Sequence, residues 1–110
     1  MSGQELYEQL SKYTSLLDRA LKEFSKRGEL YSTTERNYRV ELAKKILSER
    51  EKGTPVTIIS DICRGDENIA NLKLERDLSE GLYKSSLEAI QVYKTQIRVL
   101  ENTIEREYKS

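Results

Sequence analysis

The stretch that decides the fold is "KGTPVTIISDICRGDEN", which runs from Lys52 to Asn68 and holds the only proline, the only cysteine and two of the five glycines. Its beginning is typical of a helix end, with Gly53 just past the last turn. Thr54 is a candidate N-cap for a new helix, and Pro55 suits the first helical position. The stretch therefore predicts a turn in which a second helix starts.

The segment "VTIISDIC" predicts a short helix, because its apolar residues lie on one side of about two turns. These residues are Val56, Ile59, Ile62 and Cys63. Gly65 ends the short helix, and Asp66 caps the helix that follows. The alternative is a β-strand over Val56–Ile59, because this segment is rich in β-branched residues. In the helical interpretation, the apolar side closes one end of the core.

Upstream of this stretch, apolar residues recur in steps of four and three, which is the period of a helix face. They are Leu6, Leu10, Tyr13, Leu17, Ala20, Phe24, Tyr31, Tyr38, Leu42 and Ile46. The pattern predicts one long helix over about residues 3–52. Gly28 costs roughly 1 kcal/mol relative to alanine, so a kink or short break near Arg27–Glu29 is the alternative.

A second long stripe follows Asp66 and predicts a helix over about residues 66–109. Its members are Ile69, Leu72, Tyr83, Ile90, Tyr93, Ile97, Leu100 and Ile104, and Leu78, Leu82 and Leu87 widen it. Acidic and basic residues four apart, such as Glu8 with Lys12 and Glu80 with Lys84, support long helices with solvated outer faces.

These elements predict an all-α fold for a single helical domain, 1–110: a long antiparallel helical hairpin with a short helix within the turn, at residues 53–65. Folding back in this way places Tyr38 near Gly81 and Tyr83 near Glu35. Only 36% of the residues are hydrophobic and 35% are charged, whereas a compact domain has about 45–50% and about 25%. We therefore expect the chain to complete its core as a homo-oligomer.

The composition argues against several classes of function. Lys and Arg total 19, as do Asp and Glu, and zero net charge disfavours non-specific nucleic-acid binding. Histidine is absent, which removes the most common general base and metal ligand. No nucleophile or metal cluster stands out, so we expect no enzymatic activity, no metal and no cofactor.

The same inventory predicts a soluble, cytoplasmic protein. The lone Cys63 cannot form an internal disulfide, which fits a reducing compartment. The start of the chain lacks the basic and apolar regions of a signal peptide. No apolar run approaches the ~20 residues that cross a bilayer, so no membrane association is expected.

The middle of the predicted seam between the long helices is unusually polar. Its members are Arg76, Ser79, Tyr83 and Ser86 on the second helix, and Thr34, Asn37, Tyr38 and Arg39 on the first. One interpretation is that these positions are exposed to water or form a hydrogen-bonded layer that fixes register between protomers. The other is a ligand pocket, in which Tyr38 and Tyr83 stack on a base while Arg39, Arg76 or Arg64 holds phosphate.

Arg64 enters this hypothesis because "CRGDEN" joins two helices, and a helix start can bind anions. The structural alternative is a C-cap followed by an N-cap, since Asp66 and Glu67 already supply negative charge there. A helix–turn–helix around Gly65 is disfavoured, because its recognition helix would begin with acidic residues that face phosphates.

The segment from "NYRVELAKK" through "GTPVTIISDICRGD" to "EGLYKSSLEAI", within residues 35–105, resembles a group of small, all-helical, uncharacterised proteins of phages and prophages of Gram-positive bacteria. The resemblance implies a protein that acts by binding inside the infected or lysogenic host. Phage proteins of this kind neutralise host defences, by blocking a host defence protein or by sequestering a nucleotide immune signal. Others assist phage DNA replication or recombination through protein contacts. Counter-defence binding of a small nucleotide is the leading hypothesis, and the accessory role is the alternative.

Overall fold

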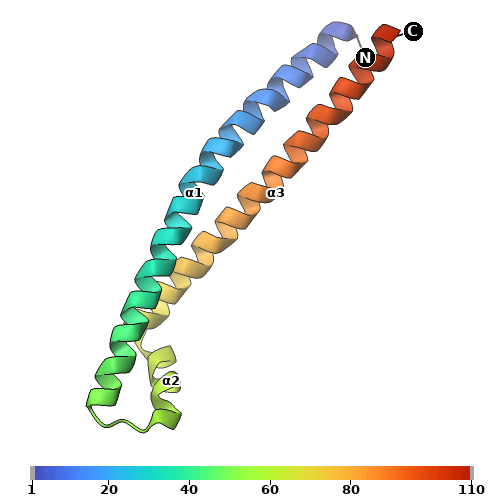
Figure 1. Cartoon of the computed structure of the whole chain (residues 1–110). Helices are drawn as coiled ribbons and strands as arrows, with labels where there is room; N and C mark the ends of the chain where they lie inside the picture. The colour runs from blue at the N-terminus through green and yellow to red at the C-terminus, as the bar shows by residue number, and fades with distance from the viewer. Residues whose placement is uncertain (1, 110) are drawn as a thin grey trace. The chain divides into compact units, whose positions relative to one another are not determined.

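The computed structural model describes residues 2–109, whose helices are labelled in Figure 1. Helix α1 spans Gly3–Glu51, α2 spans Val56–Gly65 and α3 spans Glu67–Lys109. The described residues contain no β-strand. The predicted all-α class is therefore confirmed, and the strand alternative for the start of α2 is wrong. Helix α1 is also unbroken at Gly28.

The helices form two compact units. Unit 1 contains residues 2–26 and 83–109 of the described chain, so it consists of the first part of α1 and most of α3. Unit 2 contains residues 27–82, which include the rest of α1, all of α2 and the start of α3. Each unit therefore has its own packed interior.

In unit 1, aromatic pairs join α1 to α3. Phe24 stacks on Tyr83, with ring centroids 4.8 Å apart. At the other end of the unit, Tyr7 and Tyr108 have their ring centroids 6.4 Å apart. Tyr7 lies near the start of α1 and Tyr108 near the end of α3, so the two segments run antiparallel. The buried apolar residues of this unit are Leu6, Ile90 and Leu100.

In unit 2, α2 packs with both long helices. Its buried residues, Ile59 and Cys63, join Ile69 of α3 in the core. Lys45 of α1 lies 3.6 Å from the carboxylate of Asp66, at the start of α3. Asp66 also accepts a hydrogen bond of 3.0 Å from the backbone N–H of Ile69, so the predicted N-cap of α3 is confirmed.

The turn between α1 and α2 differs from the prediction at Thr54. Gly53 has φ 78°, the left-handed conformation that glycine adopts without strain, so it ends α1 as expected. The residue that precedes α2, however, is Pro55, and it provides no side-chain cap. The Thr54 hydroxyl instead donates a hydrogen bond of 2.8 Å to Glu49. The prediction that Thr54 caps α2 is therefore wrong, because the buried Glu49 carboxylate is the stronger acceptor.

The predicted pairing of the long helices is also shifted. A Cβ added to Gly81 would meet no atom within 4 Å, so no tyrosine ring packs on this glycine. Tyr38 lies instead beside Arg76, and Tyr83 stacks on Phe24. The physical reason is α2: it packs beside the last turns of α1, so α3 begins opposite Lys45 rather than opposite the end of α1.

Candidate functional site

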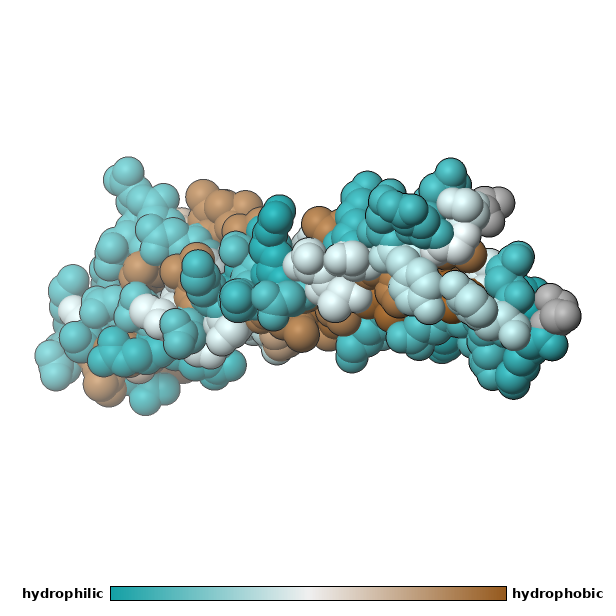
Figure 2. Space-filling view, turned by 90° about the horizontal axis from the view of Figure 1, so that it is seen from above, coloured by the Kyte–Doolittle hydropathy of each residue, from teal (hydrophilic) through white to brown (hydrophobic). Residues whose placement is uncertain are grey.

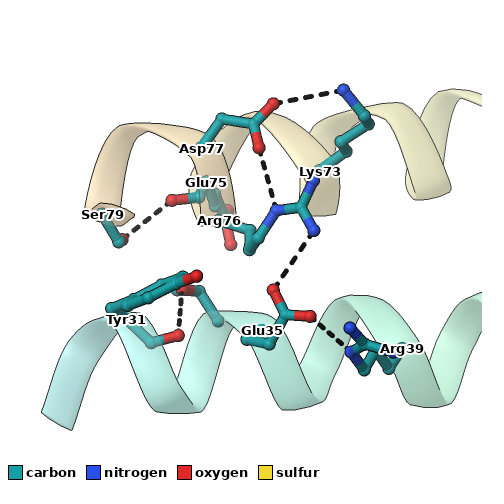
Figure 3. A network of polar contacts seen from close by, with 9 residues as sticks. Tyr31, Glu35, Arg39, Lys73, Glu75, Arg76, Asp77 and Ser79 are labelled. Carbon is teal, nitrogen blue, oxygen red and sulfur yellow. Dashed lines mark hydrogen bonds and ion pairs between the residues drawn. The ribbon is translucent and has the colours of Figure 1, made fainter. Parts of the chain in front are cut away.

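The polar seam of unit 2 is organised around Arg76 of α3, which reaches across to α1 (Figure 3). Its Nη1 donates to Glu35 Oε2 at 3.2 Å, and its Nε donates to Asp77 Oδ1 at 2.9 Å. The guanidinium carbon lies 4.7 Å from the centre of the Tyr38 ring. Two carboxylates and one aromatic face therefore hold this side chain in a single position.

The same carboxylates bind further cations. Arg39 pairs with Glu35 one turn away, and Lys73 Nζ lies 3.2 Å from Asp77. The hydrogen bond from Arg39, followed by that from Arg76, lowers the pKa of Glu35. For Asp77, the hydrogen bond from Lys73 is the largest cause of a lowered pKa. Both acids are therefore held in their charged form.

Hydroxyl groups in this seam are satisfied by nearby acceptors. Thr34 donates to the carbonyl of Tyr31 at 3.0 Å, and Ser79 donates to the carbonyl of Glu75 at 2.8 Å. Both hydroxyl residues are buried. The Tyr31 hydroxyl bonds to the Glu80 carboxylate, which raises the pKa of the tyrosine. The Thr34 and Ser79 contacts lie within their own helices, whereas the Tyr31–Glu80 contact joins α1 to α3. The hydroxyl groups are therefore satisfied within one chain, and the layer between protomers stays a prediction.

A groove in unit 2 lies beside this layer and has a volume of about 910 Å³. All three helices contribute to its wall. The lining residues are Tyr38, Leu42, Ile46 and Arg50 from α1, Val56, Ile59, Ser60, Cys63 and Arg64 from α2, and Ile69, Ala70, Lys73, Leu74 and Asp77 from α3. The buried residues Ile59, Cys63 and Ile69 belong to this lining. The groove therefore combines an apolar surface with a few charged groups, as small-molecule sites do.

The charged residues of the groove are mostly cationic. Arg50, Arg64 and Lys73 line it, and Asp77 is the acidic lining residue. Asp77 is already paired with Lys73 and with Arg76. The ion pair with Asp77 offsets the charge of Lys73, so an anion in the groove would meet positive charge mainly from Arg50 and Arg64.

The five predicted site residues are not brought to one place. Tyr38 and Arg64 both line the groove, and Arg76 lies against the Tyr38 ring. The Arg39 side chain is 75% exposed and bound to Glu35, outside the groove lining. Tyr83 belongs to unit 1, where it stacks on Phe24.

Arg64 has the most accessible charge among them. Its side chain is 80% exposed, and its nearest acid, Asp61, lies 3.9 Å away with an exposed fraction of 79%. An ion pair of this kind is worth little, so it leaves the guanidinium available to a ligand. Arg76, in contrast, is 19% exposed, and two of its guanidinium nitrogens already bind carboxylates.

Sequence reasoning missed Arg50 and Lys73 as site residues. Both residues have charged neighbours in the sequence, and nothing in the sequence pattern distinguishes them from ordinary charged residues on a solvent-exposed helix face. Val56 was expected on the apolar side of the short helix that closes the core, but it is 74% exposed, so this expectation is wrong. Leu74, which lies outside the predicted stripe, is 56% exposed. Both residues line the groove, so its wall includes exposed apolar surface.

No family model, curated protein or solved structure matches this chain. Within residues 2–109, no helix is both long enough and apolar enough to cross a membrane. No three cysteine or acidic residues in that range converge in a way that could hold a metal ion. The groove and the polar layer beside it are therefore the features from which a function is argued.

Proposed function

We propose that the protein is a phage-encoded binding protein without catalytic activity, that it acts in counter-defence by sequestering a nucleotide immune signal, and that the groove of unit 2 is its binding site. The phage origin and the counter-defence role rest on the resemblance of residues 35–105. The binding role rests on the groove, whose volume of about 910 Å³ falls within the ~300–1,000 Å³ range of ligand pockets.

One observation carries the proposal: an aromatic ring and three cations line the same apolar groove. Tyr38 offers a ring on which a base can stack, and Arg76 behind it fixes the orientation of that ring. Arg64 is the preferred phosphate ligand, because its planar fork matches phosphate oxygens and its own ion pair is weak. Arg50 and Lys73 add positive charge nearby.

The direct test is isothermal calorimetry with a panel of cyclic nucleotides and cyclic ADP-ribose isomers. We expect at least one member to bind, and Arg64→Ala to weaken that binding about tenfold or more through loss of a charge-assisted contact. Tyr38→Ala weakens it as well, whereas Tyr38→Phe retains it because the ring remains. Arg39→Ala is the matched control, since this exposed arginine lies outside the groove. Absence of heat and of any thermal shift across the panel would remove the nucleotide proposal.

The alternative is an accessory role in phage DNA replication or recombination through protein contacts. It is favoured by Val56 and Leu74, exposed apolar residues of the groove lining that suit an amphipathic helix from a partner. The cations of the groove indicate that such a helix carries acidic residues. The expected result is co-purification of a single-strand-binding protein, an annealase or a helicase from infected cells. Leu74→Glu should abolish that capture, and retention by the variant would count against this role.

A further inference from the structure

Helix α3 carries a second uncharged row in unit 1, next to the stripe that packs on α1. We call it the outer row, and its members are Ser85, Ala89, Val92, Gln96, Val99 and Thr103. They recur in steps of four and three, so they share one side of the helix. In a chain with 35% charged residues, six consecutive positions of a helix face without charge are a departure from a solvated surface.

The outer row is distinct from the stripe that meets α1. The inner stripe contains Ser86, Ile90 and Leu100, which are all buried. Each inner position follows a member of the outer row by one residue, which is a rotation of about 100° around the helix. In the outer row, Val92 is 55% exposed and Val99 is 52% exposed. The packing of α1 on α3 therefore leaves Ser85, Val92, Gln96 and Val99 exposed, while Ala89 and Thr103 are half-buried.

The chain as a whole exposes more surface than a compact domain of the same mass. The chain exposes 8050 Å², whereas a compact monomer of 12.8 kDa exposes about 6300 Å². The excess exceeds the ~800 Å² that each partner buries in a standard interface. Figure 2 shows hydrophobic side chains reaching the surface in several places between hydrophilic ones. Covering one such row would complete a core that holds few buried apolar residues.

The pattern of side-chain sizes fits a second copy of the same row in antiparallel orientation. With a two-fold axis between Val92 and Gln96, Val92 of one copy faces Gln96 of the second copy, and Gln96 faces Val92. The same axis brings Ala89 opposite Val99, so a small residue meets a larger one. A parallel pairing would instead place alanine against alanine and valine against valine, which leaves a gap in one layer and crowding in another.

Charge supports the same arrangement. Glu88 borders the outer row on the solvent side. In the antiparallel pairing Glu88 is level with Leu100 of the second copy, between Arg98 and Asn102 of the row that borders the interface there, whereas a parallel pairing brings two copies of Glu88 together. Since no member of the row is charged, a copy can pack there without burying an unpaired charge. We propose that the outer row of α3 is the interface of a two-fold symmetric, antiparallel dimer.

The first test is the molar mass of the full chain, measured by light scattering over a roughly hundredfold range of concentration. We expect the mass of two chains for the wild type. Val92→Glu should raise the dissociation constant at least about a hundredfold, because it buries a charge without a partner. Gln91→Glu, which adds the same charge at the neighbouring exposed position, should leave the dimer intact. A monomeric wild type, or equal behaviour of both variants, would overturn the proposal.

A second test fixes the orientation and does not depend on the stability of the glutamate variant. The native cysteine, Cys63, is 2% exposed and is first replaced by alanine. In that background, Ala89→Cys and Val99→Cys are made as separate proteins and then mixed under mild oxidation. The expected product is a disulfide-linked heterodimer from the mixture, with little cross-linking of either protein alone. Efficient self-linking of each protein alone would indicate a parallel pairing and refute the inference.

Discussion

Replacing Ile59 by alanine tests whether α2 is held in place by burial, as the structure of unit 2 requires. Helix α2 has 10 residues, which is shorter than the ~12–15 residues at which isolated helices become even marginally stable. Its persistence therefore depends on the two side chains that it buries, Ile59 and Cys63. Ile59 is 5% exposed, so nearly all of its side chain contributes to the hydrophobic stabilisation of α2.

The expected cost follows from the size of the deletion. Isoleucine to alanine removes three buried carbon groups, each worth about 0.8 kcal/mol, which gives about 2.4 kcal/mol before any cavity is counted. Such substitutions range from about 2 to 5 kcal/mol, and the value depends on how far the site collapses. Ile59 lines an open groove, so its neighbours can close part of the gap. We therefore expect about 2–3 kcal/mol.

The assay is urea unfolding followed by circular dichroism. With a slope of about 1.5 kcal/mol per molar urea, the midpoint should fall by about 1.3–2 M while the slope stays unchanged. Ile58→Ala is the matched control, because the neighbouring isoleucine is 45% exposed and the same calculation limits its cost to about 1.3 kcal/mol. Equal effects of the two substitutions, or a cost below about 1 kcal/mol at Ile59, would refute the packing argument for α2.

Three further substitutions test individual contacts. Asp66→Ala should cost about 1 kcal/mol through loss of the N-cap of α3, whereas Asp61→Ala, at a side chain 79% exposed, should be nearly neutral in the same urea assay. The hydrogen bond from the Thr54 hydroxyl, followed by that from Lys45, lowers the pKa of Glu49 below its ordinary 4.5. The charged carboxylate therefore contributes fully to the free energy of unfolding above pH 4.5, and this contribution is lost as the pH falls through the lower folded-state pKa. Glu49→Gln should flatten the acid side of a curve of stability against pH. Arg76→Ala should cost about 1–3 kcal/mol because it removes the charge-assisted hydrogen bonds to Glu35 and Asp77 and the packing on Tyr38, while Arg39→Ala should cost less than about 0.5 kcal/mol. A larger loss at Arg39 in thermal melts would contradict the geometry of the seam.

The helices themselves follow closely from the sequence, because hydrophobic period and breakers act locally. The apolar steps upstream of Lys52 predict α1, and Gly53 and Asp66 mark helix boundaries in the structure as they do in the chain. The register of the two long helices could not be read in the same way. It depends on how much of α1 is covered by α2, and that is a packing property of three helices together.

The candidate site was predictable only in part. Tyr38 and Arg64 were identified as ligand-binding residues, and both line the groove. Arg50 and Lys73 escaped notice because a charged residue in a charge-rich helix looks solvated until a neighbouring helix shapes the surface around it. Arg76 was assigned to phosphate, although the carboxylates of Glu35 and Asp77 occupy its donors in the structure. Sequence periodicity placed Arg76 in the seam but could not show which acids it meets.

The most direct test of the central claim, that the groove of unit 2 is the binding site, is a map of amide chemical-shift changes on titration with a nucleotide that binds. Amide proton–nitrogen correlation spectra report on every helix at once. The account predicts changes at Tyr38, Cys63 and Arg64 and their neighbours in the groove lining, with the amides around Phe24 and Tyr83 unmoved. Changes concentrated in unit 1, or spectra of unit 2 that stay the same at saturation, would contradict it.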